Sequence, residues 1–275
     1  SPEYSSMSAN LTRDPPPQAP PADTVTPLVV YSPPFQQGSL AGVQIIGYRS
    51  TAAGTVEAAR FNAADVAAAT YVRDHVHVAI NPDDPVERAM ADEIIETIFN
   101  DIREAALNGA KTFQDSLGNI YRGADLVALI KNIDFNIYDS ASAQVAGVTT
   151  LRGAQTTFAN FSDINAHATV TIELGDLAAN LGSQLWSGGL EYAVNHELGH
   201  ALPAGHQIAY QDRAAFLTGS GAGLNGAAQD QAWAASPEAR DAEQFANTLG
   251  HQIATFTGSG WLVGQPPEGY WHGLQ

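Results

Sequence analysis

Two histidines and a glutamate stand at the spacing of a catalytic metal site. The stretch His196-Glu197-Leu198-Gly199-His200 places two imidazoles four positions apart, so on a helix they share one face with their Cβ atoms roughly 5–6 Å apart. Glu197 points about one hundred degrees around such a helix, where its carboxylate can deprotonate a metal-bound water without being a ligand. The pattern predicts a zinc site at His196 and His200, with Glu197 as the catalytic base.

Local sequence signals predict the elements that carry this motif. Apolar residues place a helix over Leu190 to Leu202, and Pro203 ends it because proline cannot continue the backbone hydrogen-bond ladder. Before it, Ala168 to Leu174 alternates threonine and glutamate with valine, isoleucine and leucine, a pattern of a half-buried or edge strand. We expect this strand to lie over the helix and to pair with an extended substrate.

The stretch from His196 to His206, read as His-Glu-Leu-Gly-His-Ala-Leu-Pro-Ala-Gly-His, resembles the extended zinc signature of the metzincins, in particular the matrixin and serralysin branches. The resemblance implies a zincin-like fold, peptidase activity, and His206 as third zinc ligand beside His196 and His200. Two features differ from the family pattern. Pro203 replaces a glycine, and no methionine follows the motif, since the two methionines are Met7 and Met90.

The third ligand has an alternative source. In gluzincin-like enzymes an acidic residue on a later helix completes the site, and the stretch from Asp241 to Asn247 resembles such a helix, with Asp241 and Glu243 as candidates. We favour His206, because its spacing is specific whereas acidic residues on a solvated helix are common.

Composition narrows the classes of partner. A formal charge of -17 disfavours nucleic acid and anionic lipid surfaces, which would be repelled. No apolar run approaches the roughly 20 residues that span a bilayer, so we expect no membrane insertion. Cysteine is absent, which leaves His, Asp and Glu as metal ligands and is compatible with a bacterial protein secreted without oxidative folding. The sequence does not indicate an oligomeric state.

The remaining pattern predicts two segments. Residues 1–42 are rich in proline and are interpreted as a tail or linker, and residues 43–275 as the zincin-like catalytic domain. Within the domain the sequence predicts several further elements: strands at His75–Ile80, Ile133–Tyr138 and Val145–Leu151, a hairpin over Lys111–Arg122, and helices at Pro85–Leu107, Asp125–Lys131 and Pro237–Phe256.

Other polar residues are candidates for an oxyanion donor, a second metal site or a calcium site, but their spacing is less specific. Peptidase chemistry needs a donor for the oxyanion, and four residues after the motif are candidates: Tyr210, His251, Tyr270 and His272. His75 and His77 share a strand face, which we interpret as solvent-facing rather than as a second metal site. Ca²⁺ is a further candidate ion by the family resemblance. Its acidic candidates lack a recognisable calcium loop and are interpreted as turn and capping residues: Asp83, Asp84, Asp163 and Asp176.

Together these patterns predict an α+β chain with a zincin-like metalloprotease fold, in which a twisted mixed sheet places its edge strand over an active-site helix and a C-terminal helix follows. The expected function is a zinc-dependent endopeptidase acting on proteins or peptides. Two alternatives stay open: a noncatalytic zinc-stabilised binding or surface module, and a secreted toxin or effector protease of narrow specificity.

Overall fold

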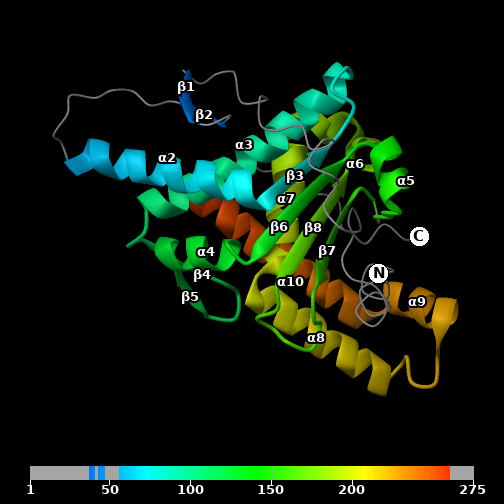
Figure 1. Ribbon diagram of the computed structural model, residues 1–275. Helices are drawn as coiled ribbons and strands as arrows, with labels where there is room; N and C mark the ends of the chain where they lie inside the picture. Colours follow the sequence, from blue (N-terminus) through cyan, green and yellow to red (C-terminus); the bar gives the residue numbers. More distant parts are fainter. Residues whose placement is uncertain (1–36, 41–42, 47–55, 151, 261–275) are drawn as a thin grey trace.

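The computed structural model describes residues 37–40, 43–46, 56–150 and 152–260. Helices and a mixed four-stranded sheet share one core (Figure 1), so the predicted α+β class is confirmed. Within the N-terminal segment, β1 (Gln37–Leu40) pairs antiparallel with β2 (Val43–Ile46), so this hairpin straddles the boundary that we set between residues 42 and 43.

The main sheet has the order β3-β6-β8-β7. Its first three strands are mutually parallel and its last pair is antiparallel: β3 (Val76–Ala79), β6 (Ile133–Tyr138), β8 (Ala168–Glu173) and β7 (Ala154–Phe158). The expectation that residues 168–174 form the edge strand was wrong. β8 lies between β6 and β7. Its threonines are buried like its apolar residues. The alternating sequence therefore marks a polar and an apolar face of the strand, and neither face is exposed to solvent.

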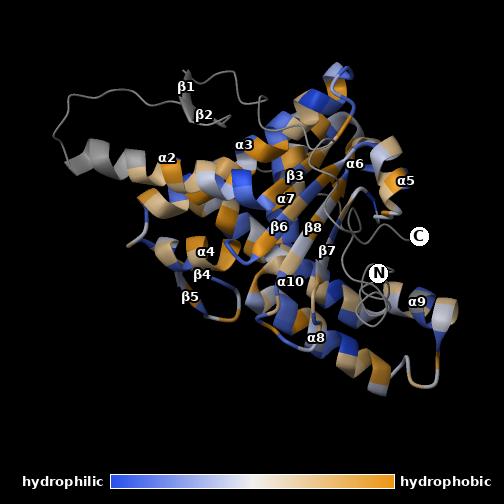
Figure 2. Cartoon of the chain, in the orientation of Figure 1, coloured by the Kyte–Doolittle hydropathy of each residue, from blue (hydrophilic) through white to orange (hydrophobic). Residues whose placement is uncertain are grey.

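Long helices cover one face of this sheet, and Figure 1 shows α7 passing behind the strands. These helices are α2 (Val56–His75), α3 (Pro85–Leu107), α7 (Leu190–Ala201) and α10 (Pro237–Thr257). α7 packs on β7 and β8 and α2 on β3 and β6, while α3 packs on α2 and α7, and α10 packs on α3 and α7. Apolar residues run through the central strands and along the inner side of α3 (Figure 2), where the buried stripe includes Met90, Ile94 and Ile98. The predicted bounds of α3 were confirmed, because Asp84 caps it, Pro85 starts it and its apolar period is helical.

Shorter elements lie at the ends of the strands. They comprise the hairpin β4 (Thr112–Gln114) and β5 (Ile120–Arg122), α4 (Gly123–Ile130), α5 (Ser140–Ala146) and α6 (Leu174–Leu181), followed by the turns η2 (Gly182–Gln184) and η3 (Leu185–Gly189). The prediction of a strand at Val145–Leu151 was wrong. Asp139 caps α5 there, Gly147 ends it with a positive φ of 67°, and the strand forms later as β7.

The helices α8 (Pro203–Thr218) and α9 (Gly226–Ala234) follow α7 in the chain. Pro203 ends α7 as predicted, but it also begins α8, since proline fits the first turn of a helix, where no intrahelical donor is needed. α9 comes after a glycine-rich turn. Over the described part of the chain, no helix combines the length and apolar character required to cross a membrane.

Candidate metal centre

Helix α7 brings the first two predicted ligands together. The Nε2 atoms of His196 and His200 lie 3.2 Å apart, as the four-residue spacing on one helical face predicts. Residues 192 to 201 of α7 are all buried, so the polar atoms of both imidazoles must find their partners within the protein. At this distance either one nitrogen donates a hydrogen bond to the other or both nitrogens face a common ion.

Glu243 on α10 supplies the third donor. Its Oε2 atom lies 3.3 Å from His196 Nε2 and 3.5 Å from His200 Nε2. Its Oε1 atom has no hydrogen-bond partner among the described residues. These three side chains form the one group of three possible metal ligands within the described residues. Of the two acidic alternatives considered from sequence, it is therefore Glu243 that lies with the imidazoles. Asp241 is exposed on the same helix.

The donor triangle has the size that zinc requires. Tetrahedral zinc with bonds of about 2.0–2.1 Å to nitrogen and oxygen separates any two ligand atoms by about 3.3–3.4 Å. The three donor atoms stand 3.2, 3.3 and 3.5 Å apart. Two imidazoles and one carboxylate also match the ligand types of catalytic zinc sites. The size of the triangle and the types of its donors are therefore compatible with a metal ion such as zinc.

Two glycines allow α10 to approach α7 this closely. A Cβ atom at Gly199 would lie 2.2 Å from the carbonyl oxygen of Ala246, and one at Gly250 would lie 2.4 Å from that of Asn195. Real Cβ atoms do not come so near, so both positions require glycine while the helices keep this spacing. The contact line between the helices runs beside Glu243, which explains how a carboxylate on α10 reaches imidazoles on α7.

The orientation of His196 is fixed from α10. Its Nδ1 atom lies 2.8 Å from Asn247 Oδ1, which also accepts the hydroxyl hydrogen of Tyr192. Because an amide oxygen can only accept, His196 carries a hydrogen on Nδ1, and in the neutral ring Nε2 is then the unprotonated nitrogen that faces the donor triangle. Asn247 stands one helical turn after Glu243, so a single face of α10 supplies a ligand and the group that orients another.

Glu197 lies beside the triangle without joining it. Its Oε2 atom accepts a hydrogen bond of 2.6 Å from Thr156 on β7, and its Oε1 atom has no hydrogen-bond partner among the described residues. Burial raises the pKa of Glu197 to about 7, and the negative charge of Glu243 adds to this, while His196 and Thr156 oppose it. A carboxylate with a pKa near neutrality can both accept and return a proton at physiological pH.

The pKa of Glu243 moves in the opposite direction. Burial by itself would raise it, but the facing imidazoles of His200 and His196 hold the pKa of this carboxyl well below its usual value. This lowered pKa favours the ionised carboxylate, which is the form that can hold a metal ion. The environments of the two buried glutamates thus shift their pKa values in opposite directions, that of Glu197 upward and that of Glu243 downward.

His206 stands apart from the donor triangle. Its Nε2 atom donates to the carbonyl oxygen of Phe161 at 2.8 Å, and its ring stacks on Phe158 with centroids 3.5 Å apart. Burial lowers the pKa of His206, which favours a neutral ring. The reason for this position is Pro203: it starts α8 where the metzincin pattern has a glycine turn, so His206 lies on a helix that carries it away from His196 and His200.

Other candidate residues take ordinary structural positions. Tyr210 and His251 are exposed, and the oxyanion candidates Tyr270 and His272 lie outside the described residues. Among the acidic candidates for calcium, Asp84 caps α3 and the side chain of Asp163 accepts from the backbone of a turn. The remaining two are exposed: Asp83 and Asp176.

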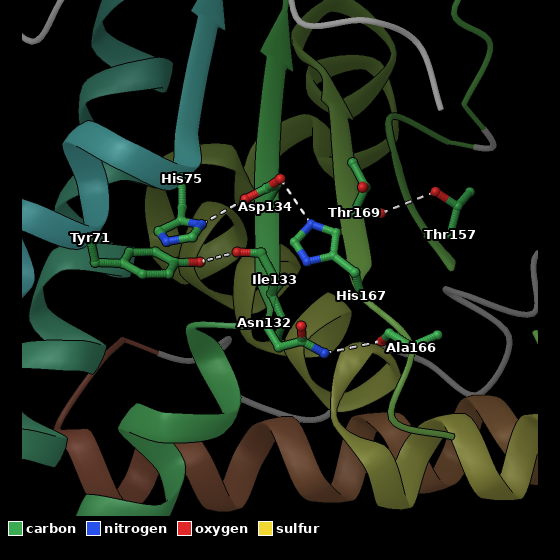
Figure 3. A network of polar contacts seen from close by, with 9 residues as sticks. All are labelled: Tyr71, His75, Asn132, Ile133, Asp134, Thr157, Ala166, His167 and Thr169. Atoms are coloured by element: carbon green, nitrogen blue, oxygen red, sulfur yellow. Dashed lines mark hydrogen bonds and ion pairs between the residues drawn. The ribbon is translucent and has the colours of Figure 1, made fainter. Parts of the chain in front are cut away.

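The expectation that His75 and His77 share a strand face was wrong, because His75 is the last residue of α2 and β3 begins at Val76. His75 belongs instead to a polar network. Figure 3 shows Asp134 on β6 between two histidines, and its carboxylate oxygens lie 2.7 Å from His75 Nδ1 and 2.8 Å from His167 Nε2. Tyr71 stacks on His75 and donates to the backbone carbonyl of Ile133. The network ties the end of α2 to the first residues of β6 and to His167, the residue before β8.

Sequence reasoning missed two residues of the site. Asn247 ends the stretch that begins at Asp241, and its spacing of four from Glu243 was the signal for a shared helix face. Thr156 was an unnoticed polar residue between Ala154 and Phe158, and no local signal indicates which helix its hydroxyl meets.

In comparisons with protein-family models, with curated proteins and with solved structures, no match to this chain was found.

Proposed function

We propose that this chain is a zinc-dependent metallopeptidase that holds its metal through His196, His200 and Glu243 and uses Glu197 as its base. One observation carries the proposal. Three buried donor atoms from two helices form a triangle with sides of 3.2, 3.3 and 3.5 Å beside a separate buried glutamate. An acidic third ligand on a later helix resembles the gluzincin-like arrangement rather than the three-histidine metzincin one.

The residues around the triangle suit hydrolysis of a peptide bond. A zinc ion bound there would polarise a carbonyl group and lower the pKa of a water toward about 7. Glu197 Oε1, which has no hydrogen-bond partner among the described residues, is available to take the proton of the attacking water and to pass it to the leaving amine. Asn247 meanwhile keeps His196 in the tautomer that leaves Nε2 open.

A second candidate function has one observation in its favour. The exposed fractions of His196, Glu197, His200 and Glu243 are 0, 1, 4 and 0%, and a closed site is typical of structural zinc. The noncatalytic zinc-stabilised module therefore stays as the alternative. It predicts zinc binding that supports the fold, with no hydrolysis.

Glu197→Gln separates the two functions. For the peptidase, the variant keeps one zinc per chain while hydrolysis of an unstructured protein substrate falls by about 10²–10⁴-fold, the usual contribution of a general base. His200→Ala loses both properties. Unchanged hydrolysis in Glu197→Gln would refute the peptidase mechanism, and a zinc-loaded wild type without hydrolysis would favour the module.

Narrow specificity needs a broader substrate set. A secreted toxin or effector would cleave no protein in a general assay. Wild type and Glu197→Gln should therefore each be incubated with a host-cell lysate. New protein N-termini that arise with wild type but not with Glu197→Gln would identify the substrate. Secretion stays a prediction.

A further inference from the structure

The sheet face toward α7 is apolar except at one residue. The strand registers place the following buried residues on this face: Val76, Val78, Ile133, Phe135, Ile137, Ala154, Phe158, Ala168, Val170 and Ile172. Thr156 lies opposite Val170 on the same face and is 3% exposed. A hydroxyl in such a layer is unfavourable unless it is hydrogen-bonded, so its partner explains its presence.

That partner is the residue proposed as the base. Thr156 Oγ1 lies 2.6 Å from Glu197 Oε2 and 3.2 Å from the carbonyl oxygen of the same residue. A hydroxyl has one hydrogen to donate, and the shorter contact with the carboxylate is the charge-assisted bond. Glu197 Oε2 is thereby anchored, and Oε1 is left without a hydrogen-bond partner in the described part of the chain.

We propose that Thr156 is a positioning residue: its hydroxyl anchors one oxygen of Glu197 so that the other faces the attacking water. This inference rests on the proposed peptidase function. A carboxylate that rotates freely spends much of its time out of hydrogen-bond reach of the water, and a fixed geometry contributes directly to rate. The anchor comes from β7, at the end of the sheet, so the placement of the base depends on the placement of that strand.

Substitutions at Thr156 can separate the effect of packing from the effect of the hydrogen bond. Valine has nearly the shape of threonine and suits an apolar layer, but it cannot donate to Glu197, whereas serine keeps the donor and loses only a methyl group. The neighbouring Thr157 points to the opposite face of β7, and its hydroxyl lies 3.4 Å from the carbonyl oxygen of Thr169. Thr157→Val is therefore a matched control that removes a hydroxyl from the same strand without touching Glu197.

The test compares Thr156→Val, Thr156→Ser and Thr157→Val with wild type, each loaded with zinc for kinetics and with cobalt for visible spectra. We expect Thr156→Val to bind one zinc per chain and to lower kcat by about 10- to 100-fold, the loss of a hydrogen bond to a charged group, with little change in KM. Thr156→Ser and Thr157→Val should stay near wild type. The cobalt spectrum of Thr156→Val should change toward that of Glu197→Gln, because both alter the surroundings of the metal's open position.

Two results would overturn the proposal: a wild-type kcat and cobalt spectrum in Thr156→Val, or equal losses in Thr156→Ser and Thr157→Val, which would show a merely structural effect. The cobalt spectra also distinguish this proposal from the peptidase function. If wild type hydrolyses nothing but the spectral contrast between valine and serine persists, the peptidase function fails and Thr156 still orients Glu197. If that contrast is missing as well, both fail.

Discussion

Glu243→Gln tests the ligand assignment at the residue that sequence spacing alone did not identify. Glutamine has almost the same shape as glutamate, so α10 should still pack against α7. The change replaces an ionised carboxylate by a neutral amide at a position 3.3 and 3.5 Å from the two imidazole nitrogens. The substitution should therefore affect two things strongly: metal binding, and the electrostatic pairing of Glu243 with His196 and His200.

The expected loss follows from the number of ligands. The free energy of zinc binding at structural sites is about 10–16 kcal/mol, and four protein ligands share it. One ligand therefore contributes about 3 kcal/mol on average. A loss of that size weakens zinc binding by roughly a hundred-fold. The amide oxygen of glutamine can still coordinate weakly, which makes this figure an upper bound for Glu243→Gln.

Competition with a chromophoric zinc chelator at fixed pH measures the affinity directly, and urea unfolding of the zinc-free proteins checks that each variant is folded. Asp241→Asn is the matched control, because Asp241 is acidic, exposed and two positions away on the same helix, and we expect a change of less than about two-fold. His206→Leu should destabilise the fold through the lost bond to Phe161 and leave zinc affinity nearly unchanged. Wild-type affinity in Glu243→Gln, or a hundred-fold loss in His206→Leu, would refute the assignment.

Three further changes test the supporting structure. Asn247→Ala removes the acceptor that orients His196, and we expect zinc affinity to fall by roughly 10- to 100-fold in the competition assay; an unchanged affinity would contradict this role. Gly199→Ala would bring a methyl carbon 2.2 Å from the Ala246 carbonyl oxygen, so we expect about 1–3 kcal/mol of lost stability in urea together with weaker zinc binding, and a fully stable variant would show that the helix spacing is adjustable. Burial raises the pKa of Asp101 to about 6 despite two hydroxyl partners. This folded-state value exceeds the unfolded one, so the contribution of Asp101 to stability is present at low pH and is lost as pH rises through about 6. Relative to wild type, Asp101→Asn should gain up to about 3 kcal/mol between about pH 4 and pH 7, and a difference in unfolding free energy that does not vary with pH would refute the shift.

Local sequence signals predicted α3, α4, α7 and α10, but not the long helices α2 and α8. The bounds of α3 follow from the cap at Asp84, the proline after it and a helical apolar period, all of which act within one or two turns of chain. Likewise, the convergence of His196 and His200 depends only on the rise and pitch of a single helix. Such features need no knowledge of distant residues, which is why the sequence was sufficient for them.

Strand order was beyond the same signals. The alternation in β8 correctly indicates two different faces, but it does not tell whether its outer neighbour is solvent or β7. The edge position of β7 is determined by which strands pair, and pairing is a property of the whole chain. Thr156 becomes meaningful only in that context, since its hydroxyl meets Glu197 across the gap between sheet and helix.

By itself, the sequence determined the pair of imidazoles, the adjacent glutamate and the absence of thiol ligands. The tertiary structure decided which candidate for a third donor lies beside the two imidazoles. Asp241 and Glu243 are chemically alike and two residues apart, and His206 has the more suggestive spacing, but only Glu243 faces α7 across the close contact that Gly199 and Gly250 permit. A metal centre assembled from two helices depends on how those helices pack, and helix packing is set by contacts between residues far apart in the chain.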